Sequence, residues 1–300
     1  MVDRVLRYKK AMREDNLLAA LWVSVFLAGT CSSAFAATPT SDSNAPKPIH
    51  ASKIVLIGDS TTAVQSGWGG AFCAEHVASS AACVNLARGG RSSGSYIVEG
   101  SWALALGELR TPGFGNTWLI IQFGHNDQPG KPGRSTDLAT EFPANLRRYV
   151  TEARAAGAKP VLVTPLTRRM FKNGVLHDDL GPWADAVKRV AAEMNVPIVD
   201  LHEQSRAAVQ AMGPTASNAL AQRPPSAEVA AAAEKGTTIS ASTGVTTTEV
   251  NDTPPVEGMG QAKLTFDYTH LGPHGADYFA KMMAASLAAA VPQMRPLLIP

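Results

Sequence analysis

The sequence has little of several features that would mark particular classes of protein. Of its 300 residues only 17% are charged, only three are cysteines, and no internal repeat is visible. The first 36 residues hold five Lys/Arg and three Asp/Glu, which leaves 22 side chains of each sign in the rest of the chain. Nucleic-acid phosphates are neutralised by a basic surplus, so this balance argues against nucleic acid as a partner. The 45% hydrophobic content excludes a disordered chain.

Only one uncharged stretch approaches the length of a membrane span, and it lies at the N-terminus. Five basic residues precede the apolar run Leu17–Ala28, and Ala34-Phe35-Ala36 follows as a small-residue cleavage site. This order is typical of a secretory signal peptide over residues 1–36, with an uncleaved anchor as the alternative. We expect a secreted or periplasmic protein with no stable membrane association after cleavage. Ala37–Ser52, rich in Pro, Ser and Thr, is expected to be a flexible leader.

The cysteines fit an exported protein. Cleavage would remove Cys31 and leave Cys73 and Cys83, ten positions apart. In an oxidising compartment such a pair is expected to form a disulfide, the alternative being two buried thiols. Neither has a histidine at metal-ligand spacing, so we expect no zinc site. No metal and no cofactor is predicted.

The rest of the chain, residues 53–300, is predicted to be one α/β domain. Short apolar runs typical of buried parallel strands alternate with helical patterns. The runs are Lys53–Ile57, Cys83–Leu86, Trp118–Phe123, Pro160–Val163 and Pro197–Asp200, and the helical patterns include Phe142–Ala156, Pro182–Asn195 and Asp277–Ala290. This alternation predicts a parallel sheet with helices on both faces, whose ligands bind beyond the carboxyl ends of the strands.

One stretch departs from this pattern. Gln222–Gly260 is rich in Ala, Ser, Thr and Gly and has little other apolar content beyond a few valines. We expect a low-complexity insertion without packed structure, which could be deleted with the fold intact.

Short polar or glycine-rich segments follow the predicted strands. They are Gly58-Asp59-Ser60 after the first, Ala87–Ser92 after the second, Gly124–Asp127 after the third, and Asp267–His270 before the last helix. Each alone is weak evidence, because turns, close backbone packing and helix caps use the same residues. Their common position at strand ends is what points to a site.

Together these segments contain the groups that acyl transfer needs. Ser60 is the candidate nucleophile, His270 the base that takes its proton, and Asp267 the carboxylate that orients the imidazole. The backbone N–H groups of Ser60 and Gly90 and the side-chain amide of Asn126 are candidate donors to the oxyanion. This chemistry requires no metal.

The same segments resemble the four blocks of SGNH/GDSL hydrolases, which carry Ser, Gly, Asn and His in this order. They stand here as IVLIGDSTTA, NLARGGRSS, QFGHND and DYTHLGPHGA, within a resemblance that covers most of Lys53–Leu287. KPVLVTPLTRRMF, PIVDLH and MGPTASNAL are similar to the branch with rhamnogalacturonan acetylesterases. The resemblance implies a flavodoxin-like three-layer α/β/α sandwich with a five-stranded parallel sheet. It also implies an esterase that removes O-acetyl groups from an acetylated, pectic polysaccharide or oligosaccharide, and we expect a monomer.

Other interpretations use these residues differently. Gly90–Gly94 also satisfies G-x-S-x-G with Ser92 at its centre, although no strand leads directly into that serine. A metal-dependent phosphoesterase could use the Gly-His-Asn-Asp segment with His270 and His274, but too few further ligands can be placed. A non-catalytic carbohydrate-binding protein would not need Ser, Asn and His together at strand ends. An SGNH esterase or lipase of another small acyl ester fits the same residues.

Further residues have both a functional and a structural interpretation. Arg168 and Arg169 could face a polyanionic sugar chain or lie in ion pairs or solvent. Trp68 and Trp183 could stack on sugar rings or belong to the core. The other histidines are expected to be structural, with His76 on a helix and His177 and His202 in loops. His125 could support the Asn126 turn through a ring hydrogen bond, but a structural role is favoured for it too.

Overall fold

The computed structural model describes residues 50–240 and 265–300. The expected signal peptide over residues 1–36 and nearly all of the expected leader lie outside the described residues. Five parallel strands form the central sheet in the order β2-β1-β3-β4-β7. They are β1 (Ser52–Gly58), β2 (Ala81–Asn85), β3 (Asn116–Gln122), β4 (Lys159–Val163) and β7 (Ile198–Val199). This is the flavodoxin-like strand order, and the predicted five-stranded parallel sheet is confirmed.

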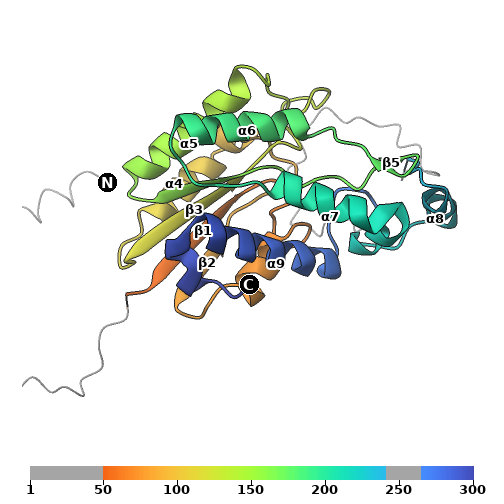
Figure 1. The fold of residues 1–300 in the computed structure, drawn as a ribbon. Coiled ribbons are helices and arrows are strands. Elements are labelled where there is room, and N and C mark those ends of the chain that lie inside the picture. The colour runs from red at the N-terminus through yellow and green to blue at the C-terminus, as the bar shows by residue number, and fades with distance from the viewer. Residues whose placement is uncertain (1–49, 241–264) are drawn as a thin grey trace, which may run out of the picture. The chain divides into compact units, whose positions relative to one another are not determined.

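Helices cover both faces of the sheet, which gives three layers (Figure 1). One face packs against α3 (Ser93–Val98), α4 (Ser101–Leu109), α5 (Glu141–Ala155) and α6 (Gly181–Glu193). The other packs against α2 (Gly69–Glu75), α7 (Leu201–Ala216), α9 (Pro273–Ala290) and the 3₁₀ helices η1 (Ser217–Leu220) and η2 (Pro292–Leu297). None of the described helices is long and apolar enough to cross a membrane.

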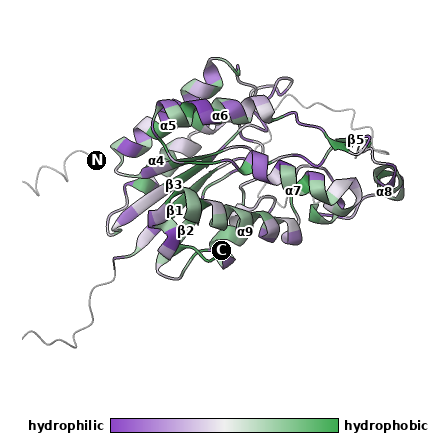
Figure 2. Ribbon diagram, viewed as in Figure 1, coloured by the Kyte–Doolittle hydropathy of each residue, from purple (hydrophilic) through white to green (hydrophobic). Residues whose placement is uncertain are grey.

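The two helical layers explain why β1 is apolar at every position from Ile54 to Ile57. Ile54 and Leu56 of β1 point into one core cluster, whereas Val55 and Ile57 point into the other. All four side chains have no exposed surface. A strand covered on both faces has no solvent side, so the alternation of polar and apolar residues disappears. Figure 2 shows the resulting hydrophobic interior of the sheet.

The register of the strands brings their following turns together. Gly58 at the end of β1 pairs with Gln122 at the end of β3, which in turn pairs with Val163 at the end of β4. A Cβ on Gly58 would lie 2.5 Å from the Gln122 carbonyl oxygen, so a larger residue cannot fit without a shift of the backbone. The turns after β1, β3 and β4 therefore leave the sheet at one edge.

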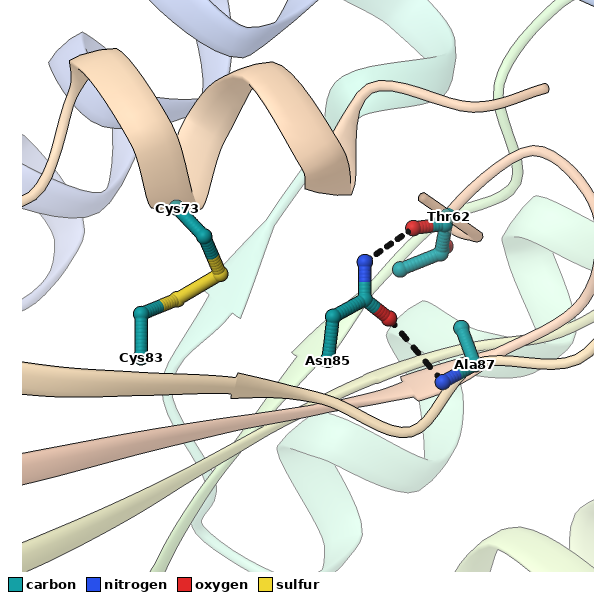
Figure 3. Close-up of a disulfide and its surroundings, with 5 residues drawn as sticks. All are labelled: Thr62, Cys73, Cys83, Asn85 and Ala87. Carbon is teal, nitrogen blue, oxygen red and sulfur yellow. Dashed lines mark hydrogen bonds between the residues drawn. A yellow bond between two sulfur atoms is a disulfide. The ribbon is translucent and has the colours of Figure 1, made fainter. Parts of the chain in front are cut away.

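The expected disulfide is confirmed. Cys73 of α2 and Cys83 of β2 are bonded, with their Cα atoms 5.4 Å apart (Figure 3). Further along β2 the Asn85 amide donates to the Thr62 carbonyl at 2.9 Å, and its oxygen accepts from the Ala87 N–H at 3.0 Å (Figure 3). The disulfide closes a short loop, for which the chain-entropy model gives a stabilisation of about 2–3 kcal/mol. The disulfide thus links α2 to the edge strand β2, and the Asn85 hydrogen bond links β2 to the turn after β1.

The expectation of an unpacked insertion over Gln222–Gly260 is wrong for residues 222–240, and the rest of that stretch lies outside the described residues. Helix α8 (Ala227–Glu234) forms there and lies near α7. Val229 and Ala233, four positions apart on one helical face, are each only 1% exposed. Two small apolar side chains are enough to pack a two-turn helix, and the composition did not reveal them among the alanines.

The residues after α8 are fixed by backbone hydrogen bonds. They join the hairpin formed by β5 (Phe171–Lys172) and β6 (Val175–Leu176). The Thr238 N–H donates to the Phe171 carbonyl at 2.9 Å, and the Gly174 N–H donates to the Gly236 carbonyl at 2.7 Å. Every residue type has the same backbone N–H and carbonyl groups, apart from proline. The contact between the residues after α8 and the hairpin could therefore not be predicted from the sequence. Deleting the whole stretch would remove packed structure, contrary to the sequence-based expectation.

One histidine lies on a different element from the one expected. His202, predicted in a loop, is the second residue of α7, because Asp200 caps this helix by accepting a hydrogen bond from Glu203 N at 3.3 Å. The helix therefore begins at Leu201, with only Asp200 between it and β7. His76 lies at the C-terminal cap of α2, and His177 lies in a loop as predicted.

Candidate active site

The turn after β1 presents Ser60 at the carboxyl edge of the sheet. Asp59 Oδ1 accepts hydrogen bonds from the backbone N–H and the hydroxyl of Thr61, both at 2.8 Å. The Ser60 carbonyl accepts a hydrogen bond from Ser66 Oγ at 2.7 Å. The turn is thus tied down on both sides of Ser60, which limits the directions its hydroxyl can take.

The segment before α9 brings a histidine and an aspartate to this serine. His270 Nε2 lies 2.9 Å from Ser60 Oγ, and His270 Nδ1 lies 2.6 Å from Asp267 Oδ2. Asp267 Oδ1 accepts hydrogen bonds from the N–H groups of Thr269 and His270, both at 2.7 Å. Carboxylate, imidazole and hydroxyl therefore form one continuous chain of hydrogen bonds.

The protonation state of Asp267 decides which groups donate and which accept in this series of hydrogen bonds. Burial raises the pKa of the carboxyl, but the hydrogen bond and charge of His270 and the two backbone N–H donors outweigh it and lower the pKa to about 2. At neutral pH Asp267 is a carboxylate and can only accept hydrogen bonds. The neutral imidazole of His270 therefore carries its proton on Nδ1, and Nε2 accepts the hydrogen bond from Ser60.

A buried arginine, Arg169, forms hydrogen bonds to the backbone of the same segment. The Arg169 side chain, 1% exposed, donates to the carbonyls of Asp267 at 2.8 Å, His270 at 3.0 Å and Thr269 at 3.3 Å. Its backbone N–H donates to the Tyr268 carbonyl at 2.9 Å. Burial lowers the pKa of the guanidinium to about 10, so it is still a cation at neutral pH. A buried arginine cannot face a sugar chain, so Arg169 follows neither of its sequence-based interpretations.

Arg168 and the two tryptophans follow their structural interpretations. Arg168 forms an ion pair with Asp179 and donates to Gln128 Oε1 at 2.9 Å. Trp68 has no exposed surface and Trp183 is 4% exposed, so both belong to the core rather than to a sugar-stacking surface.

The loops that carry Gly90 and Asn126 lie beside Ser60. Gly90 adopts a left-handed backbone with φ of 76°. A Cβ on the preceding Gly89 would lie 3.7 Å from the Cβ of Ser60. Asn126 Nδ2 donates to the Arg91 carbonyl at 3.1 Å, which ties the third block to the second. An amide nitrogen has two hydrogens, so one remains for another acceptor.

A buried pair links the first and third blocks. His125 Nδ1 lies 3.5 Å from Asp59 Oδ2, and the exposed fractions of the two residues are 2% and 0%. Burial lowers the pKa of the His125 imidazole, although the charge of Asp59 opposes this. His125 is therefore structural, as expected, and its ring faces the turn after β1 rather than the Asn126 turn.

The alternative nucleophile Ser92 is a helix cap. It has no exposed surface, and its hydroxyl accepts a hydrogen bond from Ser95 N at 3.1 Å at the start of α3. The neighbouring Asp127 Oδ1 accepts from Ser93 Oγ at 2.6 Å and from Thr136 Oγ1 at 2.9 Å. Burial raises the pKa of Asp127 to about 6. These groups fasten α3 to the turn after β3.

Sequence reasoning missed one further supporting residue, Gln122. Its side-chain oxygen accepts from Trp68 Nε1 at 2.9 Å and from Thr62 Oγ1 at 2.5 Å, and its amide donates to the Thr164 carbonyl at 3.0 Å. A polar residue near the end of an apolar strand was the available signal. Among residues 50–240 and 265–300, no three His, Cys, Asp or Glu side chains gather so that they could hold a metal ion.

Comparison with known proteins relates this chain to two curated proteins of Bacillus subtilis strain 168. It is 38% identical over 164 residues to the probable rhamnogalacturonan acetylesterase YesY, which covers 52% of this chain and 73% of that protein. It is also 38% identical over 182 residues to the rhamnogalacturonan acetylesterase RhgT, which covers 58% of this chain and 74% of that protein.

A solved structure and a family model extend the likeness. The crystal structure of protein YxiM of Bacillus subtilis is similar in fold, with a TM-score of 0.57, 20% identity, and coverage of 81% of this chain and 58% of that one. The model of the GDSL-like lipase/acylhydrolase family matches residues 56–214, which include the Ser, Gly and Asn segments. The chain belongs to the GDSL-like lipase/acylhydrolase family, and it is a carboxylic ester hydrolase.

Proposed function

We propose that this protein is a serine acetylesterase that removes O-acetyl groups from a polysaccharide, specifically from pectic rhamnogalacturonan. The observation that carries the proposal is the chain of hydrogen bonds from Asp267 through His270 to Ser60. The printed names of the two Bacillus relatives, both rhamnogalacturonan acetylesterases, support the choice of substrate.

In the first half of the reaction Ser60 is the nucleophile. Its Oγ attacks the acetyl carbonyl carbon while His270 Nε2 accepts the hydroxyl proton. Asp267, ionised at neutral pH, accepts the hydrogen bond from Nδ1–H and stabilises the imidazolium that forms. The imidazolium then donates its proton to the sugar oxygen as the C–O bond breaks. The deacetylated sugar leaves, and the acetyl group stays on Ser60.

In the second half water replaces the sugar. His270 takes a proton from the water, whose oxygen attacks the acetyl-serine, and then returns the proton to Ser60 Oγ as acetate leaves. Both tetrahedral intermediates place negative charge on the former carbonyl oxygen. The N–H groups of Ser60 and Gly90 and the free amide hydrogen of Asn126 donate to this oxygen. Donors already held by the fold need little rearrangement during the reaction.

We also propose that the protein is exported. The signal-peptide pattern over residues 1–36 and the Cys73–Cys83 disulfide both fit an oxidising compartment outside the cytoplasm.

The identity of the nucleophile is tested by a matched pair of serine variants. Ser60→Ala is expected to abolish acetate release from acetylated rhamnogalacturonan. Ser92→Ala should keep a substantial fraction and lose only cap stability, about 1 kcal/mol. Acetate release and thermal melting of both variants provide the check. The reverse result would refute the assignment, and activity only on small esters would favour a general esterase.

The oxyanion role of Asn126 is tested by Asn126→Ala. Loss of one such donor typically costs about 10²–10³ in rate, because the hydrogen bond is stronger in the transition state than with the substrate. We expect kcat to fall by this factor with KM similar to that of the wild type. Steady-state kinetics on a soluble acetyl ester measure both. An effect below about tenfold would mean that Asn126 only ties the loops together through the Arg91 carbonyl.

The support that Arg169 gives to the catalytic segment is tested by Arg169→Met and Arg169→Lys. Removing the guanidinium frees three carbonyls, and a misplacement of about 1 Å in the reacting groups can lower the rate on the order of 100-fold. We expect kcat to fall with little change in KM for Met, and partial rescue by Lys, which keeps a donor and the charge. A folded Met variant with normal kcat would contradict this role.

A further inference from the structure

Two cations lie beside the proposed oxyanion hole. The loop after β3 carries Lys131 and Arg134. Lys131 Nζ donates a hydrogen bond to the carbonyl of His125, the residue before Asn126. Arg134 Nη1 lies 3.5 Å from the Gly90 carbonyl. One cation is therefore fastened to the third block and the other lies against the second.

Neither of these two cations forms an ion pair with an acidic side chain of the described residues. Within the described ranges no carboxylate lies within 4.0 Å of the Lys131 ammonium or the Arg134 guanidinium, whereas the nearby Arg168 is paired with Asp179. Burial lowers the pKa of Lys131, the positive charges of Arg168 and Arg134 lower it further, and the negative charges of Asp59 and Asp179 act in the opposite direction. Apart from its first 36 residues the chain has equal numbers of both charges, so this local excess does not reflect a basic protein.

The loop that carries the cations is held in a defined shape. The Lys131 N–H donates to Ser135 Oγ at 2.9 Å, and Ser135 Oγ donates to the Gln128 carbonyl at 2.8 Å. The Arg134 N–H donates to the Lys131 carbonyl at 3.0 Å. Because the turn is already formed, a ligand that binds there does not have to order it first.

We propose that Lys131 and Arg134 bind the carboxylate of a uronic-acid residue close to the acetylated sugar. The guanidinium offers a planar pair of donors that matches a carboxylate, and the half-buried ammonium adds a point charge. Binding there would hold the acetyl group over Ser60 and select acidic over neutral acetylated polysaccharides. This inference rests on the proposed function and specifies how that site recognises its substrate.

The test compares one polysaccharide in two forms. Acetylated rhamnogalacturonan is used as it is and after chemical reduction of its uronate carboxylates to alcohols. Acetate release is measured for the wild type, Lys131→Gln and Arg134→Gln. Lys281→Gln and Arg110→Gln, which remove exposed cations elsewhere, are the matched controls. The readout is the ratio of kcat/KM for the acidic form to kcat/KM for the reduced form, so any general change in the loop cancels.

We expect the wild type and both controls to prefer the acidic form. Each test variant should lower the ratio about threefold or more, an effect of the size expected for a partly exposed ion pair. Added salt should lower the ratio for the wild type more than for the variants. A ratio unchanged in both variants, or lowered equally in the controls, overturns the proposal. A wild type that releases acetate from neither form, while cleaving small acetyl esters, refutes the proposed polysaccharide function and this inference with it.

Discussion

The hydrogen bond between His270 Nε2 and Ser60 Oγ joins segments 210 positions apart, and much of the fold serves to hold it. At 2.9 Å such a contact tolerates only small displacements of either partner. The serine side is fixed because β1 lies between β2 and β3 and ends in a tied turn. The histidine side is fixed because α9 packs on the sheet and the preceding segment is bonded to Arg169. In the proposed mechanism, neither half can act without the other.

Beneath this contact the structure buries an unusual set of polar groups. Gln122, Arg169 and the Asp59–His125 pair are all nearly or fully inaccessible to solvent. Burying such groups is costly unless they find partners, and removing one partner leaves the other unsatisfied. Gln122 and Arg169 form hydrogen bonds to the turns that carry the site: Gln122 to Thr62 and Thr164, and Arg169 to the Asp267 carbonyl. The polar layer therefore makes the active-site edge of the sheet sensitive to substitution, even at residues that do not touch the substrate.

The charged groups around Ser60 form two sets, Asp267 with His270 and Lys131 with Arg134. Asp267 stays ionised next to His270, with a pKa of about 2, so the first set supports proton transfer from Ser60. The second set, Lys131 and Arg134, carries positive charge and forms no ion pair with a carboxylate among the described residues. Catalysis and substrate selection would then depend on different residues and could vary independently.

Strong local patterns explain which features were predictable from the sequence. Apolar runs with intervening helical periodicity predicted all five strands of the sheet, and strand ends predicted where Ser60, Gly90 and Asn126 would lie. The disulfide followed from two cysteines in an expected oxidising compartment. The strands were predictable because burial on both faces of a parallel sheet makes each strand a continuous apolar run. The sequence by itself thus determined the fold class, the chemical groups and the edge of the sheet where they meet.

Tertiary structure alone decided how those groups are supported. From the sequence, Arg169 was interpreted as a cation that faces a sugar chain, an ion-pair partner or solvent. In the structure it donates hydrogen bonds to the carbonyls of Asp267, Thr269 and His270. His125 faces Asp59, Ser92 caps a helix, and α8 packs through Val229 and Ala233, none of which follows from local composition. These contacts connect residues far apart in the chain and often involve backbone carbonyls, which every residue type carries. Periodicity records which face of an element is buried, but only the assembled fold determines which polar group meets which partner.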